Sequence, residues 1–333
     1  MSVTRVLFTE PEVFDNRLRS ELPNYWDCTF KYFSNESELL EYVGLNSFDI
    51  VFARLGLFIG PSFFKISTAT KLIATPTTGL DHIDLKAAEA AGTHVLSLRG
   101  EIDFLRSITS TAEHAWGLLI ACNRQIPALI DRTRNGHWAR GDFELNQLSD
   151  KTLGIIGLGR LGLMVADYGQ SFRMNVLAYD PYVTAKDFPI TVEKVNLDKL
   201  LSESDHIILT ASYTAGDPII LDRKEILSIK RAATFINVSR GELVDELALV
   251  EAIDLGVLRA VGVDVLPGDS KWAENEQVDS PLIQKSRETD LVLVTPHVGG
   301  YAKEAIIQTR RFIVQCVKQY TKIKRIYDHE NNC

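Results

Sequence analysis

The sequence predicts an α/β protein with two doubly wound parallel sheets. Short apolar runs alternate with polar, helix-compatible stretches over roughly the first hundred residues, and the alternation starts again after residue 150 with stronger apolar runs. The runs of the second half are almost wholly apolar, which is typical of strands that helices cover on both faces. At 333 residues the chain is long enough for two domains of ordinary size.

The first domain is expected from four apolar runs, which are in chain order "RVLFT", "FDIVFAR", "KLIATPTTG" and "THVLSL". Stretches such as "NESELLEYVG" separate these runs and are compatible with helices. The segment "STAEHAWGLLIACNRQI" (residues 110–126) has helical apolar periodicity and is predicted to lead out of this domain. The last expected helix is the amphipathic "AKEAIIQTRRFIVQCVKQY".

The second domain is expected to hold a six-stranded sheet after the polar loop "RTRNGHWARGDFELNQLSD". Its strands are "TLGIIGLG", "NVLAYD", "HIILTA", "TFINVS", "AVGVDV" and "LVLVTPH". In "LVDELALVEAIDLG", Asp245 is placed to cap the following helix and Gly256 is placed to end it.

Composition excludes several classes of protein. The formal net charge of −8 argues against a partner such as nucleic acid, because binding a polyanion needs a clustered basic face. No uncharged stretch is long enough to span a bilayer, and the amino terminus does not resemble an export signal. The four cysteines form no C-x-x-C pair, so neither a disulfide framework nor a metal site is indicated. We therefore expect a soluble protein of the reducing cytoplasm.

A glycine-rich loop predicts the cofactor. The stretch "GIIGLGRLG" supplies Gly157, Gly159 and Gly162 in G-x-G-x-x-G spacing between an apolar strand and a helix. These glycines permit a tight turn and close approach of a pyrophosphate, which the amides at the helix start then bind. The next strand ends in Asp180, where a carboxylate can accept hydrogen bonds from a ribose 2′-hydroxyl and disfavours a 2′-phosphate. The pattern favours NAD over NADP. In the structural alternative, the glycines only tighten a turn and Asp180 only ends a strand.

With these motifs the chain resembles the NAD-dependent D-2-hydroxyacid dehydrogenases, the family that includes phosphoglycerate, glycerate and formate dehydrogenases. The resemblance covers nearly the whole chain and depends on "GIIGLGRLG", "INVSRGELVDE", "VGVDV" and "TPHVGG" in that order, with "RNGHW" as a weaker support. It implies two Rossmann-like or flavodoxin-like domains with the active site in the cleft between them. The substrate domain is then residues 1–104 with 299–333, and the NAD-binding domain is residues 105–298. A homodimer through the nucleotide-binding domain is also implied.

The resemblance also assigns roles to individual side chains. His297 of "TPHVGG" is similar to the general acid/base, Arg240 to the residue that binds the substrate carboxylate and carbonyl, and Asp264 to a contact of the nicotinamide carboxamide. An imidazole can give and take a proton near neutrality, and a guanidinium has the planar fork that matches a carboxylate. The positions expected to contact the cofactor are Gly157, Gly159, Arg160, Leu161, Gly162, Asp180, Thr210, Ser212, Val238, Ser239, Arg240, Asp264, His297 and Gly299.

One departure from the family concerns the third catalytic residue. Where the family has a glutamate that hydrogen-bonds the histidine, this chain has Asp269, which is shorter by one methylene, or about 1.5 Å of reach. We expect Asp269 to orient His297 as a shorter acid. Two alternatives remain open: Glu274 or Glu276 substitutes from the following loop, or Asp269 is only a loop acid in a weakened enzyme.

Two other departures concern ligand loops. In "ATPTTGLDHID", Thr77 replaces the first glycine of the family's substrate-binding turn, while Thr78 and Gly79 can still present amides to a carboxylate. This stretch is similar to the erythronate-4-phosphate dehydrogenase branch, although we do not expect the extra C-terminal domain of that branch. In "LTASYTAG", Thr210 and Ser212 stand where the family's cofactor-side strand usually ends in His-x-Pro.

A last departure is the long link "SLRGEIDFLRSITSTAEH", which brings in Arg99 and Arg106. Together with Arg54, which stands at the place of a substrate-binding arginine, they could line a cationic pocket for a phosphorylated or dicarboxylic substrate. In the alternative, they are solvated loop charges.

The sequence therefore predicts an NAD-linked enzyme that interconverts a D-2-hydroxy acid and its 2-oxo acid. The alternatives are a dinucleotide-sensing regulator of the corepressor type and a member that binds NAD but reacts poorly. The substrate itself is not predicted, because the side chains that select it lie in the loops that depart from the family.

Overall fold

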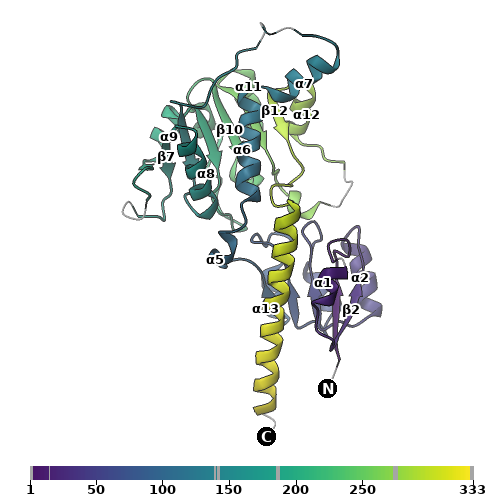
Figure 1. Ribbon diagram of the computed structural model, residues 1–333. Helices are drawn as coiled ribbons and strands as arrows, with labels where there is room; N and C mark the ends of the chain where they lie inside the picture. Colours follow the sequence, from purple (N-terminus) through teal and green to yellow (C-terminus); the bar gives the residue numbers. More distant parts are fainter. Residues whose placement is uncertain are drawn as a thin grey trace. The chain divides into compact units, whose positions relative to one another are not determined.

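The computed structural model describes residues 3–14, 16–138, 140, 143–184, 188–272 and 277–330. The chain divides into two compact units, each made of more than one segment of the sequence. Figure 1 colours the chain by position along the sequence. The first unit takes in Met1–Leu105, Ser270–Glu276 and Lys303–Cys333, and the second takes in Arg106–Asp269 and Gln277–Ala302. Each unit has its own parallel sheet.

The first unit is built on a five-stranded parallel sheet of order β2-β1-β3-β4-β5. The strands are β1 Thr4–Phe8, β2 Trp26–Phe30, β3 Ile50–Phe52, β4 Leu72–Ala74 and β5 His94–Leu96. The four predicted strands are confirmed, but the prediction missed β2. This strand lies at the sheet edge and is only partly buried, so its sequence "WDCTF" lacks the continuous apolar run of the inner strands.

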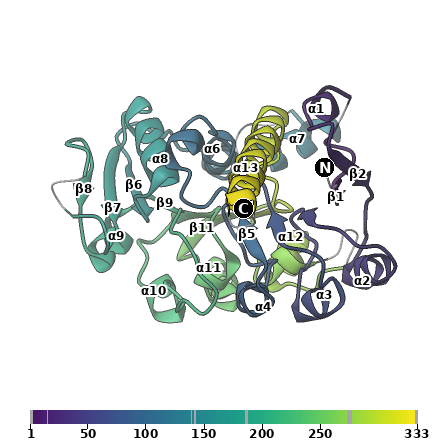
Figure 2. The same cartoon turned by 90° about the horizontal axis from the view of Figure 1, so that it is seen from below.

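Helices cover both faces of this first sheet. They are α1 Asn16–Ser20, α2 Glu36–Leu45, α3 Pro61–Ile66, α4 Leu85–Ala90, α5 Ile102–Leu105 and α13 Lys303–Glu330. Figure 2 shows α1 and α13 on one face of the sheet and α2, α3 and α4 on the other. Two apolar clusters match these faces, because one joins the strands to Ile313, Val314 and Val317 of α13 and the other joins them to α2, α3 and α4.

The second unit is built on a seven-stranded parallel sheet of order β12-β11-β10-β9-β6-β7-β8. The strands are β6 Thr152–Ile156, β7 Asn175–Tyr179, β8 Glu193–Lys194, β9 His206–Leu209, β10 Ala233–Asn237, β11 Leu258–Val263 and β12 Val292–Val294. The six predicted strands are confirmed. The seventh, β8, has two exposed polar residues that pair only with β7 at the edge, and no apolar run marks it in the sequence.

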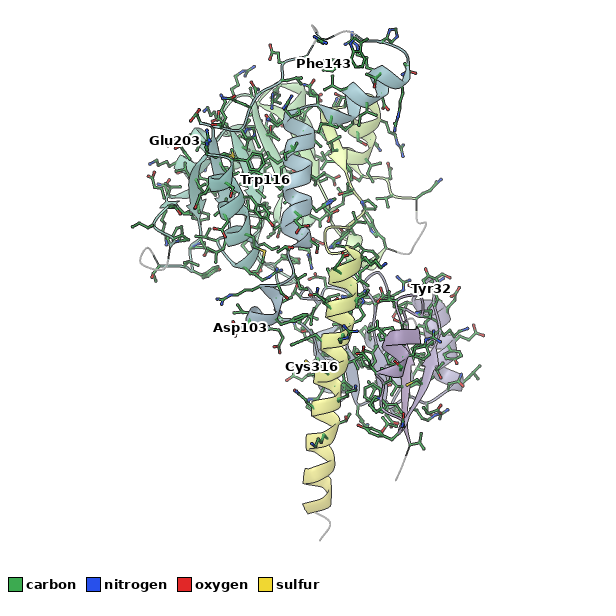
Figure 3. All side chains as sticks on the ribbon, in the orientation of Figure 1. Tyr32, Asp103, Trp116, Phe143, Glu203 and Cys316 are labelled. Carbon is green, nitrogen blue, oxygen red and sulfur yellow. The ribbon has the colours of Figure 1, made fainter. Side chains whose placement is uncertain are left out.

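Helices also cover both faces of the second sheet. They are α6 Ser110–Asn123, α7 Ile126–Arg134, α8 Arg160–Ser171, α9 Leu197–Glu203, α10 Arg223–Leu227, α11 Glu246–Asp254 and α12 Pro281–Glu288, with short 3-10 helices η2 Gly241–Leu243 and η3 Asp269–Lys271. In Figure 2, α6 and α8 lie on one face and α9, α10, α11 and α12 on the other. Trp116 of α6, labelled in Figure 3, packs against Tyr168 and Phe172, which fixes α6 beside α8.

The helix predicted over residues 110–126 is wrong at its carboxyl end. α6 stops at Asn123, Gln125 adopts a left-handed conformation with φ of 48°, and α7 then runs to Arg134 inside the predicted polar loop. Pro127 explains the break, because proline at the start of a helix lacks the N–H that a continuous helix needs. By contrast, the predicted start of α11 is confirmed, since the Asp245 side chain accepts a hydrogen bond from Ala248 N.

None of the helices in the described ranges combines the length and the apolar character that crossing a bilayer requires.

Candidate active site

The glycine-rich loop joins β6 to α8 and leaves the start of the helix open. Gly157 has φ of 92°, and a Cβ there would lie 2.5 Å from Cα of Ala211. A Cβ at Gly162 would overlap the carbonyl oxygen of Gly157, so the helix packs directly on the loop. At Gly159 a Cβ would meet no atom within 4 Å, and no side chain caps the helix. The loop therefore fits a pyrophosphate, which would approach Gly159 and accept hydrogen bonds from the first amides of α8.

Asp180 stands at the end of β7, beside this loop. Its Oδ2 accepts a hydrogen bond from Leu158 N at 2.9 Å, and its Oδ1 accepts from Tyr182 N at 2.8 Å and Val183 N at 3.1 Å. These bonds fix the carboxylate at the mouth of the loop. An ionised carboxylate has about four acceptor positions, so Asp180 can still bind the hydroxyls of a ribose.

The ends of β9 and β10 support the loop from the side of Gly157. The Oγ1 of Thr210 donates to the carbonyl oxygen of Gly157 at 2.7 Å, and the Oγ of Ser239 donates to Ala211 O. Thr210, Val238 and Ser239 are buried, whereas Ser212 is exposed. On the helix side, Arg160 Nη1 donates to Ile108 O at 2.8 Å, and Leu161 packs against the core of the unit.

Arg240 follows β10 in a turn that Asn237 shapes. The buried Asn237 side chain accepts a hydrogen bond from Ser239 N at 2.9 Å and donates to Arg240 O at 3.0 Å. The Arg240 guanidinium is half-buried, and its Nη1 donates to Ser239 O at 2.8 Å. The turn thus delivers a cation to the carboxyl edge of the sheet.

His297 lies in the loop after β12 with an unusual backbone. Its φ is 54°, and its N–H points at the carbonyl oxygens of Asp264 and Thr295, both at 2.9 Å. Its Nδ1 lies 3.0 Å from Oδ2 of Asp269, at ion-pair distance, although the two groups are not aligned for a hydrogen bond. The structure therefore brings Asp269 to His297. Glu274 and Glu276, the two alternative acids, lie outside the described residues.

Asp264, at the end of β11, clamps the His297 loop. Its Oδ1 accepts from Thr295 Oγ1 at 2.6 Å and Val298 N at 2.9 Å, and its Oδ2 accepts from Gly299 N at 2.7 Å. Burial alone would raise the pKa of this carboxyl, but the hydrogen bonds from His114, Thr295 and the loop amides outweigh it and lower the pKa. The Asp264 side chain is only 2% exposed. Its main role in this structure is therefore to fix the loop that carries His297.

Two residues of this clamp were missed in the sequence. His114 Nε2 lies 2.9 Å from Thr295 Oγ1 and 3.2 Å from Asp264 Oδ1. The one available signal was a histidine on the segment of helical apolar periodicity that forms α6, and a single residue of that kind predicts no role. Thr295 stood two residues before His297, within the quoted motif.

In the first unit, Arg54 is turned inward. It is 6% exposed, its Nη1 and Nη2 donate to Leu55 O at 3.0 Å and Phe33 O at 2.8 Å, and its guanidinium lies 4.7 Å from the ring centroid of Tyr32, labelled in Figure 3. Two of its five N–H donors thus bond carbonyl groups of its own unit, while its buried Nε has no hydrogen-bond partner among the described residues. The substrate-binding role of Arg54 stays a prediction. Arg99 belongs to the first unit and Arg106 to the second, and both are exposed.

The turn that carries Thr78 and Gly79 follows β4 and is fixed by its own hydroxyl groups. Thr77 Oγ1 donates to Gly79 O at 2.7 Å and lies 3.0 Å from Thr75 Oγ1, which is 3.2 Å from Nε2 of the buried His82. The Thr77 side chain thus supplies a constraint of its own where the family has a glycine. Thr78 is exposed, as a ligand contact requires.

The second unit therefore gathers its predicted residues at one edge of the sheet. Gly157, Asp180, Thr210, Arg240, Asp264 and His297 follow β6, β7, β9, β10, β11 and β12 respectively. Ligands of doubly wound sheets bind at this carboxyl edge. Within the described part of the chain, no group of three or more His, Cys, Asp or Glu side chains could hold a metal ion.

The comparisons with known proteins agree with this geometry. Residues 116–299 match the NAD-binding domain of D-isomer specific 2-hydroxyacid dehydrogenases. A hydroxypyruvate reductase of Thermotoga maritima is 33% identical over 274 residues, which cover 82% of this chain and 84% of that protein. The chain belongs to the D-isomer specific 2-hydroxyacid dehydrogenase family. The predicted family is confirmed, and NAD is the cofactor of its second unit.

Two further members of the family show how far the likeness extends. The D-3-phosphoglycerate dehydrogenase of Mycobacterium tuberculosis H37Rv is 35% identical over 258 residues, which cover 77% of this chain but 46% of that protein. The chain thus spans about half the length of this relative. The D-lactate dehydrogenase of Aquifex aeolicus, solved with NAD and lactic acid, has a TM-score of 0.81 at 25% identity over 96% of both chains. The predicted fold class is confirmed.

Proposed function

We propose that this dehydrogenase family member interconverts a D-2-hydroxy acid and its 2-oxo acid with NAD. The observation that carries the proposal is the placement of a histidine–carboxylate pair, His297 and Asp269, and a cation, Arg240, at the carboxyl edge of the NAD-binding sheet. The relatives named above are a hydroxypyruvate reductase, a phosphoglycerate dehydrogenase and a lactate dehydrogenase, so each name contains a small 2-hydroxy or 2-oxo acid.

The chain's own residues divide the work. When bound, NAD supplies the group that accepts a hydride from C2 of the hydroxy acid. His297 removes the hydroxyl proton during oxidation and returns it during reduction, and Asp269 at 3.0 Å stabilises the imidazolium. Arg240 binds the substrate carboxylate through its planar fork, which a lysine could not match. Asp264 keeps the His297 loop in its left-handed conformation.

The first unit contributes the substrate side of the proposal. The turn at Thr78 and Gly79 offers amides to the substrate carboxylate, and the exposed Arg99 of this unit meets a phosphate or second carboxylate on the substrate. Arg106, which belongs to the second unit, is the other cation proposed for this group. Arg54 bonds Phe33 O and Leu55 O within this unit, and its contact with an anionic substrate stays a prediction.

We also propose a homodimer in the cytoplasm, joined through the NAD-binding unit. Helix α7 has no buried residue, and an apolar set on and after it is exposed: Ile126, Ile130, Trp138 and Leu145. A second copy of this surface would cover these side chains. Light scattering of the protein and of Ile130→Glu tests this, since the variant should shift the species from dimer to monomer, and a monomeric parent chain would contradict it.

The decisive experiment follows NADH absorbance across 2-oxo acids, both plain and phosphorylated. His297→Ala should lower kcat by about 10²–10⁴-fold through the loss of proton transfer. NADH should still bind, because the glycine-rich loop and Asp180 are retained. His137→Ala, at an exposed histidine of the same unit, is the matched control and should leave kcat unchanged. If NADH binds but no 2-oxo acid is reduced, the two alternatives, a dinucleotide-sensing regulator and a member that binds NAD but reacts poorly, are favoured. Activity that survives His297→Ala would exclude the assigned acid/base.

A further inference from the structure

We propose that Glu242 is a positioning residue that holds Asp269 against His297. The inference rests on the proposed function, because it concerns how the acid of the histidine–carboxylate pair reaches its partner. It involves residues of the second unit only, and all of them are described.

The side chain of Asp269 is shorter than the glutamate that the family has at this position. An aspartate at position 269 reaches about 1.5 Å less far than a glutamate would, and a difference of that size breaks a contact if the backbone stays in place. Yet Asp269 Oδ2 lies 3.0 Å from Nδ1 of His297. The backbone that carries Asp269 must therefore make up the difference.

A tight turn supplies this approach. Asp269 N donates to Leu266 O at 3.2 Å, which closes a four-residue turn with Pro267 and Gly268 at its centre, and Gly268 has φ of 82°. Proline followed by a residue of positive φ is typical of a type II turn. The Asp269 carboxylate also accepts from Leu266 N at 3.1 Å, so the side chain folds back over the turn and points at the histidine.

Glu242 fastens this turn to the Arg240 segment. Its Oε1 accepts a hydrogen bond from Gly268 N at 2.9 Å, and this is the N–H at the tip of the turn. Gly241 makes the contact possible, because a Cβ there would overlap the backbone between Leu266 and Pro267. Glu242 is half-buried, which strengthens a hydrogen bond to a charged acceptor. The segment that carries the substrate-binding cation thus also sets the position of the acid.

The first test uses the full chain and changes Glu242. Glu242→Ala releases the turn and should lower kcat about 10-fold or more with little change in the KM for NADH. Glu242→Gln keeps an acceptor oxygen and should retain kcat within about threefold. Glu251→Ala, at an exposed ion pair with Arg223, is the matched control and should have no effect.

The decisive comparison is a double-mutant cycle with Asp269→Glu. In the parent chain the longer acid is too long for the tight turn, so kcat should fall. In the Glu242→Ala background the same change should raise kcat, because the longer side chain spans the gap that the relaxed turn leaves. An effect of Asp269→Glu in the same direction in both backgrounds would overturn the proposal, as would a Glu242→Ala variant with parental kcat.

Hydrogen exchange at the Gly268 amide separates this proposal from the proposed function. Exchange should accelerate in Glu242→Ala and stay slow in Glu242→Gln, whether or not any 2-oxo acid is reduced. If the parent chain reduces none, the proposed function fails, while equal exchange in both variants would show that Glu242 does not hold the turn.

Discussion

Each of the two sheets has a point at which the strand order reverses, but different residues lie at that point in the two units. The strand order reverses between β1 and β3 in the first unit and between β6 and β9 in the second. A threonine stands at each reversal: Thr9 N donates to Phe52 O at 3.1 Å, and Thr210 N donates to Ile156 O at 2.9 Å. Doubly wound sheets bind ligands at this point.

The size of the side chains at the strand reversal determines whether backbone amides there are accessible to a ligand. In the second unit, glycines leave bare amides at the start of α8. In the first unit, the buried pair of Glu10 and Arg310 occupies the corresponding place, with Arg54 turned inward beside Thr9. The same topology therefore gives a ligand site in one sheet and an internally bonded edge in the other.

The largest expected effect is a loss of stability at the strand reversal of the first sheet, which we call the closed reversal because the Glu10–Arg310 pair fills it. Glu10 and Arg310 are 6% and 9% exposed at the side chain and share three hydrogen bonds of 2.6–2.9 Å. Glu10→Gln leaves Arg310 charged, buried and without its counter-charge, so urea unfolding should show a loss of about 3–5 kcal/mol. Glu21→Gln, at the half-exposed pair with Arg311, is the matched control and should cost less than about 1 kcal/mol. Equal losses of stability in Glu10→Gln and Glu21→Gln would mean that the pair at the strand reversal is no more important than a half-exposed ion pair.

The next effect lies at the open reversal. Gly162→Ala places a methyl group against the carbonyl oxygen of Gly157, so the loop or the helix must shift, at a cost of about 1–3 kcal/mol. NADH affinity, measured by fluorescence titration, should fall about 10-fold or more, because the displaced loop no longer fits the pyrophosphate. Gly117→Ala, at an exposed helical glycine whose Cβ would meet no atom within 4 Å, should leave NADH affinity unchanged. Unchanged affinity in both variants would contradict the assigned loop.

A third prediction concerns His206, a buried ionisable side chain at the amino edge of the second sheet. Unlike Glu10 and Arg310 of the first unit, it is not part of a buried ion pair of opposite charges among the residues that the structure describes. Burial and the nearby Arg259 lower the pKa of His206 to about 4, against an opposing contribution from Asp205 and further lowering by Lys151 and Lys230. Below a pH of about 6.5 the unfolded chain binds this proton and the folded chain does not, so stability falls as the pH drops from 6.5 towards 4.

His206→Gln should remove that loss. Relative to the parent chain, the variant should gain about 2 kcal/mol between pH 7.5 and pH 5 in urea unfolding. His137→Gln, at an exposed histidine, should leave the pH dependence as it is. An identical pH dependence of the His206 variant and the parent chain would mean that folding does not lower the pKa of His206.

The same contrast explains what the sequence could predict. Gly157, Gly162 and Asp180 act through backbone conformation and hydrogen bonds to amides close by, and both are encoded in short motifs with fixed spacing. The contacts of Arg54 could not be predicted, because a long side chain on a loop can bond partners that are distant in sequence, here Phe33 O, 21 residues away. His114 was missed for a similar reason, since its partner Thr295 is 181 residues away.

The smallest expected effect compares the two threonines directly. Thr210→Val removes the hydrogen bond to Gly157 O at 2.7 Å and a longer one to Ile156 O at 3.4 Å. Thr9→Val removes the bond to Phe52 O and also leaves Arg54 N without the Thr9 hydroxyl as acceptor. Valine has nearly the shape of threonine, so each lost bond should cost about 0.5–1.5 kcal/mol. Because Gly157 belongs to the cofactor loop, Thr210→Val should also weaken NADH binding by a few-fold, about 0.5–1 kcal/mol, whereas Thr9→Val should change only the free energy of unfolding. Weaker NADH binding in the Thr9 variant alone would mean that the closed reversal, and not the glycine loop, contacts the cofactor.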